Sequence, residues 1–509
     1  MNIVLFTDAD VFAGTERHIL DLAVALVARG QTVTIACPVP APLADKARAA
    51  GIRVLAVAKR RMPDFAAVKI LAAELRAGRV DIIHAHNGRT HLLAVAAVKL
   101  AGRGRVVATQ HFLAPNRTGR HGPKAWLAGV LHRWAEKNTA ASIAISQAVK
   151  DQMLIRGDAR AEKITVVHNG TTEPEKTSAE RIAALRAELG VGDGLMVFCA
   201  ARLQKEKDIP TLIKAAGALC CTDHGSRITD QKLGDGRTRN LEPGTLNTEC
   251  TYNTANTEAV ACNLTSTPNS SPPPDGATEN PEGDEGGFTT EVGEVTEAEN
   301  TECPEPPNIL PTFFIAGEGD QRGECERLIA ALRFTDHGSR ITDQKLGDEA
   351  EVTGLAGQPA GRGPAGAGQN SSAALPENSR FQVAGSNSAS GVRLLGFWSD
   401  VSALMAACDI FVLPAPAEPF GLVIIEAMAL GKLVIAAGAG GPLEIVADGE
   451  TGLLFAPGNW DSLAAAIKQL VADPGLRKRM GLAGRKRYEE MFTAQQMAEK
   501  MLAVYAAGR

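Results

Sequence analysis

The sequence predicts an α/β protein with two domains, each a parallel sheet covered by helices. Short apolar runs alternate with amphipathic helical patterns through the first 170 residues, and a second series of the same kind begins near Leu195. Such alternation is typical of parallel sheets. Two segments of unusual composition leave 370 of the 509 residues outside them. At ~100–200 residues per domain, that length is enough for two hydrophobic cores.

The expected first domain covers residues 1–172 and has a Rossmann-like pattern. Residues Glu16–Ala28 carry apolar side chains at helical spacing, and Gly30 follows as a stop signal. The short apolar runs that we interpret as buried strands are Ile3–Phe6, Thr32–Ala36, Val54–Val57, Ile82–His84, Val106–Thr109, Ser142–Ile145 and Ile164–Val167.

A polar linker, residues 173–190, leads to an expected second Rossmann-like domain at residues 191–485. The final segment, 486–509, contains the helical pattern Ala494–Tyr505, which is long enough to cross back to the first domain. Two such domains would face a cleft at the carboxyl ends of their strands, where ligands bind in open sheets. The strands expected in the second domain are Leu195–Ala200, Phe313–Ala316, Val392–Leu395, Ile410–Leu413, Leu433–Ala436 and Gly452–Phe455.

The two unusual segments, residues 221–303 and 334–389, interrupt the second domain at loop positions. The first carries 16 acidic and 4 basic residues, and the second 6 and 4. The remaining core therefore has a net charge of +9, although the whole chain has −5. Both segments begin with the same 14 residues, TDHGSRITDQKLGD. They are rich in polar residues, Pro and Gly, and we expect disorder there because such a composition buries little apolar area.

Several function classes are disfavoured by composition. The longest apolar runs fall short of the ~18–20 residues that span a bilayer, and the start, MNIVLFTDAD, has no basic region typical of a signal peptide. Nine cysteines without a CxxC spacing predict reduced thiols, a cytoplasmic location and no structural metal site. Basic residues form no long stripe and aromatics are only 4%, which disfavours nucleic-acid binding.

The strongest candidate for a site is the segment Glu418-Pro-Phe-Gly-Leu-Val-Ile-Ile-Glu426, which follows an expected strand. Pro419 and Gly421 suit a turn into a helix, Leu422–Leu430, whose free amides attract an anion such as a diphosphate. Carboxylates at such a position suit sugar hydroxyls better than phosphates, because they repel the anion. The alternative is an exposed turn residue followed by a surface helix residue.

Two further segments lie at expected strand ends. Arg202 and Lys207 follow Leu195–Ala200, where Arg can hold phosphate oxygens and Lys adds a point charge; the alternative is a solvated charge run. Gly14 and Glu16 lie in a glycine turn after the first strand. The turn is not a GxGxxG motif, which disfavours a nicotinamide-dependent enzyme.

Taken together, these segments resemble the retaining glycosyltransferases of the GT-B fold, specifically glycosyltransferase family 4. The resemblance covers nearly all of the 370-residue core. The segments that carry it are Gly14, Asp81-Ile-Ile-His-Ala-His86, Thr109-Gln-His111, Val166-Val-His-Asn-Gly170, Arg202 with Lys207, Ile315-Ala-Gly-Glu-Gly319, Leu395-Gly-Phe397 with Asp400-Val401, Glu418 with Glu426, and Asp448-Gly-Glu-Thr-Gly452.

The resemblance implies a role for each of these residues. Arg202 and Lys207 would neutralise a donor diphosphate without a metal, and Gly14 would let the backbone approach it. Glu426 would hold the ribose hydroxyls. Glu418, with the amides of Phe420, Gly421 and Leu422, would bind the transferred sugar, and His111 would touch the sugar or the acceptor. We also expect His84, His86 and Glu16 on the acceptor side. Because His84 and His86 flank Ala85 at a strand end, we expect one of them to reach the cleft and the other to pack in the core.

We therefore expect a retaining transferase that moves a sugar from a nucleoside diphosphate to a glycan or lipid-linked acceptor, with no cofactor. Residues 117–137 mix basic residues with two tryptophans, which suits either contact with an anionic membrane or an ordinary packed helix. Two other functions stay open: a nucleotide-sugar epimerase or hydrolase on the same fold, and a non-catalytic scaffold that the inserted segments inactivate.

Overall fold

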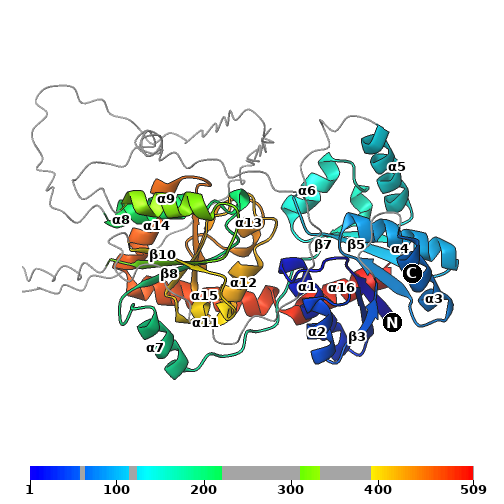
Figure 1. The fold of residues 1–509 in the computed structure, drawn as a ribbon, viewed down its shortest axis with the longest axis horizontal. Helices are drawn as coiled ribbons and strands as arrows, with labels where there is room; N and C mark the ends of the chain where they lie inside the picture. The colour runs from blue at the N-terminus through cyan, green and yellow to red at the C-terminus, as the bar shows by residue number, and fades with distance from the viewer. Residues whose placement is uncertain (58–63, 114–122, 221–309, 333–390, 508–509) are drawn as a thin grey trace, which may run out of the picture. The chain divides into compact units, whose positions relative to one another are not determined.

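The computed structural model describes residues 1–57, 64–113, 123–220, 310–332 and 391–507, and it contains two parallel sheets with flanking helices (Figure 1). The α/β class and the presence of two sheets are thereby confirmed. The segments 221–303 and 334–389, for which the sequence predicts disorder, lie outside the described residues.

The first sheet has seven parallel strands in the order β3-β2-β1-β4-β5-β6-β7. Each strand expected from the apolar runs is present with its bounds shifted by a residue or two. In chain order they are β1 (Asn2–Phe6), β2 (Thr32–Cys37), β3 (Arg53–Ala56), β4 (Ile82–Ala85), β5 (Arg105–Gln110), β6 (Ala141–Ala144) and β7 (Ile164–Val166).

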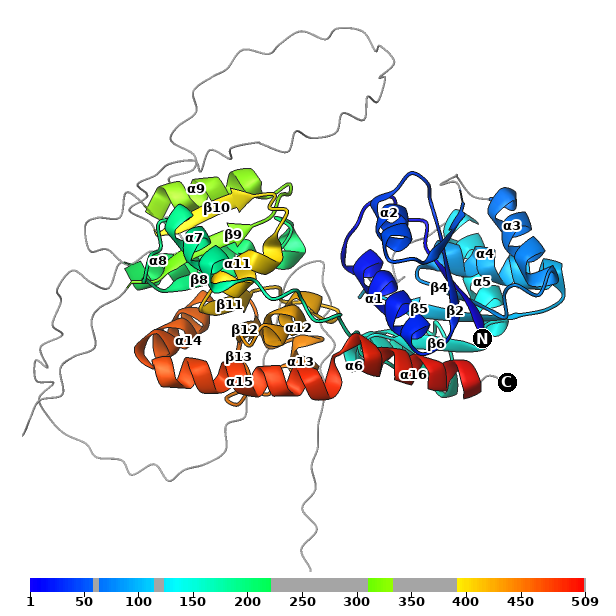
Figure 2. The same cartoon turned by 90° about the horizontal axis from the view of Figure 1, so that it is seen from below.

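Side chains on alternate positions of each strand enter two different cores, because successive strand residues point to opposite faces. In β1, Ile3 and Leu5 pack on one face, and Val4 and Phe6 on the other. Figure 2 shows α1 and α2 on one side of this sheet and α3 and α4 on the other. The helices of this half are α1 (Gly14–Ala28), α2 (Pro42–Ala49), α3 (Phe65–Arg76), α4 (Gly88–Ala101), α5 (Pro123–Lys137) and α6 (Gln147–Ile155).

The second sheet has six parallel strands in the order β10-β9-β8-β11-β12-β13. They are β8 (Met196–Ala200), β9 (Thr312–Ala316), β10 (Val392–Gly396), β11 (Ile410–Leu413), β12 (Leu433–Ala437) and β13 (Gly452–Phe455). The α-helices of this half are α7 (Ala179–Glu188), α8 (Ile209–Cys220), α9 (Arg322–Leu332), α11 (Val401–Ala407), α12 (Leu422–Ala429), α13 (Pro442–Ile445), α14 (Trp460–Ala472) and α15 (Pro474–Met491).

The last helix, α16 (Ala494–Ala507), belongs to the core of the first sheet although it follows α15 in the chain. Met497, Met501 and Tyr505 pack there against residues of β1 and α1. The chain segment just before α16 is fixed by backbone hydrogen bonds, in which Thr171 donates to Phe492 and accepts from Ala494. Gly170 is tightly enclosed at this point, since a Cβ atom on it would lie 2.3 Å from the carbonyl oxygen of Thr493.

Candidate functional site

Both sheets have a topological switch point, which is the place where the strand order reverses. In the first sheet it lies between β1 and β4, and in the second between β8 and β11. Ligands of open α/β sheets bind outside the carboxyl ends of strands at such points. Candidate residues follow each of these four strands: Gly14 and Glu16 at the start of α1 after β1, His86 after β4, Arg202 and Lys207 after β8, and Glu418 after β11.

Lys207 and Glu418 form an ion pair, although they are 211 residues apart in the chain. The Lys207 Nζ donates to Glu418 Oε2 over 2.5 Å, and the two side chains are 20% and 13% exposed. Lys207 ends a short 3-10 helix, Lys205–Lys207, directly after β8. The pair places a cation and a carboxylate side by side at the switch point of the second sheet, so the sequence-predicted residues do meet.

Arg202 lies in the same loop as Lys207 but points to solvent, where it faces Glu206 over 3.8 Å with its side chain 62% exposed. Its backbone is held by the loop after β9. Leu203 donates to Glu318 O, and Gln321 donates to Leu203 O. Glycines make this contact possible: Cβ atoms on Gly317 and Gly319 would lie 1.9 Å from Ala201 O and 2.1 Å from Leu203 O.

Helix α12 begins at Leu422, after Gly421 in the left-handed region with φ of 109°. The N-cap residue Gly421 has no side chain to cap this helix, so the amides of its first turn can donate to an acceptor on a ligand. Phe420 is enclosed at 1% exposure and packs on His168 and Phe492. Phe420 can therefore contribute its amide to a site, but its ring belongs to the core.

Glu426 lies on α12, and burial raises the pKa of its carboxyl group to about 7. The positive charge of Arg17 works against this rise, and Asp21 adds to it. Arg17 itself donates from Nε to Asp21 Oδ2 over 2.9 Å. Near neutral pH the Glu426 carboxyl group is thus divided between its neutral and ionised forms, either of which can hydrogen-bond to a hydroxyl.

The glycine turn after β1 approaches α12 closely. A Cβ atom on Gly14 would lie 3.4 Å from the Leu422 Cδ1 atom. Glu16 is 3% exposed and accepts a hydrogen bond from the Ala13 amide over 3.1 Å, so its carboxyl group closes the first turn of α1. Burial raises the pKa of Glu16. Its predicted place on the acceptor side stays a prediction.

Four histidines gather beneath the switch point of the first sheet. His84 is fully enclosed, with Nδ1 2.7 Å from the Tyr505 hydroxyl and Nε2 2.6 Å from Thr109 Oγ1. Its role is therefore to pack and to hydrogen-bond within the core. His86 and His111 contact each other through Nδ1 and Nε2 at 3.1 Å, and the ring of His18 lies 4.8 Å from that of His111. Burial holds all four rings neutral by lowering their pKa values.

Two polar contacts that no sequence pattern predicts join the half that contains the first sheet to the half that contains the second. Glu444, at the start of α13, accepts from the amide of Gln147 over 2.8 Å and from His168 Nε2 over 2.8 Å. Ser146, the N-cap of α6, donates to the Pro419 carbonyl over 2.7 Å. These partners are 273 or more residues apart, so local sequence patterns carry no signal for them. The Glu444 carboxyl group thereby closes the amino end of α6.

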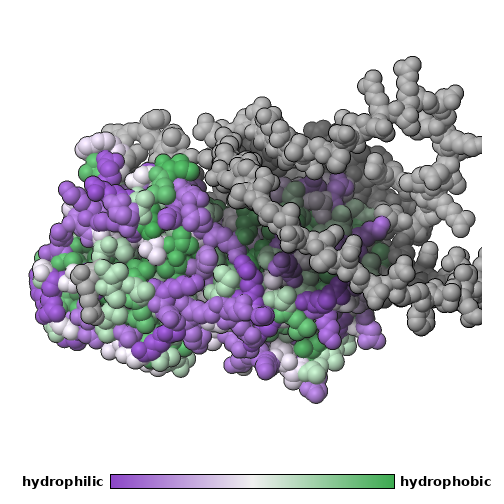
Figure 3. Space-filling model, turned by 180° about the vertical axis from the view of Figure 1, so that it is seen from behind, coloured by the Kyte–Doolittle hydropathy of each residue, from purple (hydrophilic) through white to green (hydrophobic). Residues whose placement is uncertain are grey.

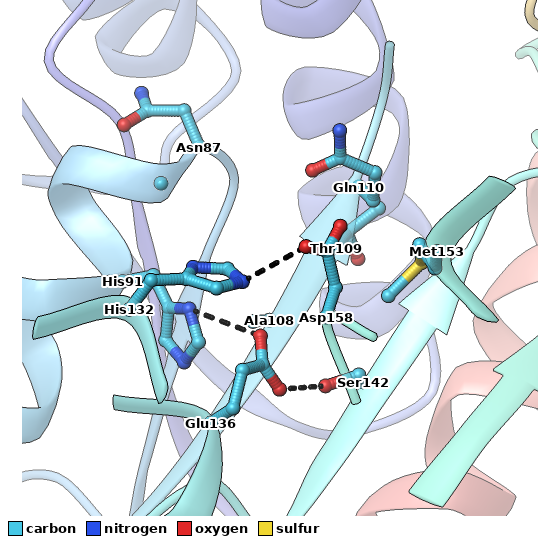
Figure 4. A pocket seen from close by; sticks show the side chains of 11 residues that line it. Asn87, His91, Ala108, Thr109, Gln110, His132, Glu136, Ser142, Met153 and Asp158 are labelled. Carbon is cyan, nitrogen blue, oxygen red and sulfur yellow. Dashed lines mark hydrogen bonds and ion pairs between the residues drawn. The ribbon is translucent and has the colours of Figure 1, made fainter. Parts of the chain in front are cut away.

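A second polar cluster lines a small pocket between β5, α4 and α5 (Figure 4). The Glu136 carboxyl group lies between Ser142, which donates to it over 3.0 Å, and His91, whose Nδ1 is 3.6 Å away. His132 faces Asp158 over 3.3 Å. Glu136 contacts Ser142 and His91, and His132 contacts Asp158, so these side chains form an internal polar network.

The surface of the described residues mixes hydrophilic and hydrophobic patches on the face drawn in Figure 3. On α5, Trp126 and Leu127 are exposed at 69% and 50%. The neighbouring stretch from residue 114 to 122, with Arg117 and Arg120, lies outside the described residues. Among the helices that the structure describes, none is both long and apolar enough to cross a membrane.

Comparison with known protein families gives two matches in different parts of the chain. Residues 12–172 match the family model described as Glycosyltransferase Family 4, and residues 377–487 match the model described as Glycosyl transferases group 1. Together these matches cover more than half of the chain.

Among curated proteins, alpha-maltose-1-phosphate synthase of Mycolicibacterium smegmatis is 42% identical over 108 residues, which are 20% of this chain and 28% of the relative. The lipopolysaccharide core biosynthesis glycosyltransferase LpsE of Rhizobium meliloti is 34% identical over 116 residues, 23% of this chain and 34% of the relative. The matched stretch thus spans about a third or less of the length of these relatives.

Among solved structures, Anabaena Alr3699/HepE in complex with UDP and glucose aligns with a TM-score of 0.62 at 19% identity, and covers 99% of both chains. The lipopolysaccharide outer core galactosyltransferase WaaB aligns with a TM-score of 0.52 at 14% identity, again over 99% of each chain. At this level of identity the alignments establish a common fold.

Proposed function

This chain belongs to glycosyltransferase family 4 and has the GT-B fold, and from this premise we propose that it moves a sugar from a nucleoside diphosphate to a glycan or lipid-linked acceptor. The names of the curated relatives point to polysaccharide or lipopolysaccharide synthesis. The solved neighbour that binds UDP and glucose supports a uridine nucleotide as the first donor to test. We also propose a cytoplasmic reaction.

The observation that carries this proposal is the Lys207–Glu418 pair beside the uncapped start of α12. A donor diphosphate bound there would accept from the amides of Gly421 and Leu422 and attract Lys207 away from Glu418. Glu418 would then be free to accept from hydroxyls of the sugar. The pair thus keeps two oppositely charged groups in place until a ligand with phosphates and hydroxyls engages both.

The leaving group is a nucleoside diphosphate, whose developing negative charge has to be stabilised during the transfer. Lys207 and the helix amides provide fixed positive charge, and the exposed guanidinium of Arg202 can fold onto the phosphate oxygens. We therefore propose that the phosphates are neutralised by the chain's own groups and not by a divalent ion. The rate should then be independent of added Mg²⁺ or Mn²⁺.

His111, at 6% exposure, is the histidine of its cluster that retains contact with the surface, and we assign to it the contact with the transferred sugar or the acceptor hydroxyl. Retention of the anomeric configuration is part of the proposal. It is tested by following the anomeric proton of the first product by NMR.

The deciding experiment incubates the full chain with UDP-sugars and GDP-sugars, with and without a lipid-linked glycan acceptor. The proposal predicts a glycosylated acceptor with the wild-type chain, and a transfer rate lowered at least roughly 100-fold in a Lys207→Met variant. Conversion of the donor without acceptor would instead identify an epimerase or hydrolase. A chain that binds no donor in a thermal-shift screen, while a variant without residues 221–303 and 334–389 does bind, would identify an inactivated scaffold.

A further inference from the structure

Helix α5 exposes large apolar side chains on the side where a surface helix usually carries polar ones. Trp126, Leu127, Leu131 and Trp134 are 69%, 50%, 38% and 39% exposed. With about 3.6 residues per turn, these four positions fall within an arc of roughly 140° around the helix axis. They therefore form one continuous surface, which we call the α5 apolar face.

The buried side of the same helix is polar. Glu136 accepts from Ser142 Oγ over 3.0 Å, and its other carboxylate oxygen lies 3.6 Å from His91 Nδ1 (Figure 4). His132, one turn earlier on α5, faces Asp158 over 3.3 Å. These contacts fix the rotation of α5 about its own axis. The α5 apolar face cannot turn inward without leaving buried polar groups unpaired, which is unfavourable.

The neighbouring helices α3 and α4 have the usual arrangement. Val68, Leu71 and Leu75 of α3 are buried, as are Leu93 and Val95 of α4. Helix α5 differs from both, because its largest side chains lie on the outside. A contiguous exposed apolar surface on a globular protein is typical of a contact with a partner, so we infer that the α5 apolar face is covered when the protein works.

The charge around this face distinguishes between partners. Glu136, the one acidic residue in the sequence of α5, is turned inward, whereas Arg133 and Lys137 are exposed. Residues 1–172 contain 24 Lys and Arg against 12 Asp and Glu, a net charge of +12, and the rest of the 370-residue core has a net charge of −3. A second copy of the chain would bring positive charge against positive charge at this face. An anionic lipid surface is complementary to it.

We propose that the α5 apolar face docks the protein on an anionic lipid bilayer. Trp126 and Trp134 enter the boundary between headgroups and acyl chains, where tryptophan rings are favoured, and Arg133 and Lys137 reach the lipid phosphates with their long side chains. Helix α5 has 15 residues and lies on the membrane without crossing it. The face contains none of the residues assigned to donor or acceptor, so the proposal goes beyond the transfer reaction and does not depend on it.

The test measures co-sedimentation of the full chain with vesicles of phosphatidylcholine, alone or with about 30% phosphatidylglycerol. We expect binding to the anionic vesicles only, weakened by added salt. Trp126→Ser combined with Trp134→Ser should lower the partition coefficient at least roughly 10-fold, and Arg133→Gln combined with Lys137→Gln should do the same. Phe65→Ser is the matched control, because Phe65 lies on α3 in the same half and is 67% exposed; its binding should be unchanged.

Tryptophan fluorescence reports directly on the docked residues. The chain has four tryptophans, so replacing Trp398 and Trp460 by Phe leaves only the two of α5. Anionic vesicles should shift the emission of this variant to shorter wavelength and protect it from quenching by iodide, because the rings leave water. Neither donor nor acceptor is present in these measurements, so a failure of the docking proposal and a failure of the proposed transfer reaction are distinguishable.

Three results would overturn the proposal. The first, which needs no variant, is a wild-type chain that stays in the supernatant with anionic vesicles. The second is vesicle binding that Phe65→Ser weakens as much as the double tryptophan variant does, which would place the contact elsewhere. The third is a wild-type dimer in analytical ultracentrifugation that the double tryptophan variant converts to a monomer, which would show that a second copy of the chain covers the face. Circular dichroism of each variant checks the fold.

Discussion

Replacing Glu426 by glutamine should make the protein more stable and a worse binder of its donor. Burial raises the pKa of the Glu426 carboxyl group to about 7, from 4.5 for an ordinary glutamic acid. Folding therefore takes up a proton between these pH values, and the free energy of unfolding falls as the pH rises from about 4.5 to about 7. Glutamine has nearly the same shape and carries no charge, so the free energy of unfolding of the variant does not fall in this way as the pH rises.

The magnitude follows from the size of the shift. One pKa unit corresponds to about 1.4 kcal/mol, so the full shift sets a ceiling of roughly 3 kcal/mol above pH 8. The attraction of Arg17 is already included in this shift. Burying the polar amide of glutamine costs part of the gain, and we expect about 1–2 kcal/mol. For a unit of ~150–250 residues this corresponds to a rise in Tm of roughly 2–8 °C. At pH 4.5 the variant and the wild type should have the same Tm.

Donor binding should change in the opposite direction. The resemblance to family 4 implies that the ionised Glu426 carboxylate accepts hydrogen bonds from the ribose hydroxyls of the proposed donor, and a hydrogen bond to a charged group contributes about 1.5–3 kcal/mol. Glu426→Gln should therefore weaken the binding of UDP by about 10- to 100-fold at pH 8. Isothermal titration calorimetry measures this, and differential scanning calorimetry from pH 4.5 to 8.5 measures the stability.

Glu444→Gln is the matched control with the opposite sign. Burial alone would raise the pKa of Glu444, but the hydrogen bonds from His168 and from the amides of Gln147 and Ala148 outweigh it, and the pKa is lowered. The stability that this carboxylate contributes is present above about pH 4.5 and is lost as the pH falls through its lowered pKa. Glu444→Gln should thus lower Tm at pH 7. A Glu426→Gln variant that is no more stable than wild type at pH 8 would refute the reasoning.

Three further outcomes are expected. Lys207→Met should lower the transfer rate at least roughly 100-fold in a product assay, with a circular dichroism spectrum like that of wild type, because it removes a charge that acts on the leaving group. Gly441→Ala should lower Tm strongly, since its Cβ atom would lie 2.2 Å from Phe420 Cα; Gly323→Ala, where nothing lies within 4 Å, is the control. Tyr505→Phe should cost about 1–2 kcal/mol in denaturant unfolding, because it removes the hydroxyl bonded to His84 Nδ1; unchanged values would contradict the assigned contacts.

The strands were predictable because their signal is local. Apolar runs such as Ile3–Phe6 and Ile410–Leu413 are buried on both faces, as strands of a covered parallel sheet must be. The parallel order then brings loop residues to one edge, which is why Lys207 and Glu418 could be assigned to one site before their contact was known. They are 211 residues apart in the chain, but β8 and β11 are neighbouring parallel strands, so the loops that follow them lie at the same edge of the sheet.

Three features of the site could not be predicted from the sequence, because they depend on side-chain directions that no local pattern encodes. In the sequence, His18 is one residue of an amphipathic helical pattern with no feature that marks a site. Its approach to His86 and His111 depends on how α1 packs on the sheet. The contact of Glu444 with His168 spans 276 residues. The protonation of Glu426 likewise follows from burial, which the spacing from Glu418 does not reveal.

Two features of the candidate site lower the stability of the ligand-free chain. The charge of Glu426 is poorly solvated, and Gly421 holds a backbone angle that other residues rarely adopt. Elsewhere the strands and helices of the described residues are well packed. Local features that cost stability are typical of functional sites. Ligands that supply the missing partners should therefore stabilise the chain, and the stabilisation by a donor should grow as the pH rises past 7, where the ionised Glu426 most needs hydrogen bonds.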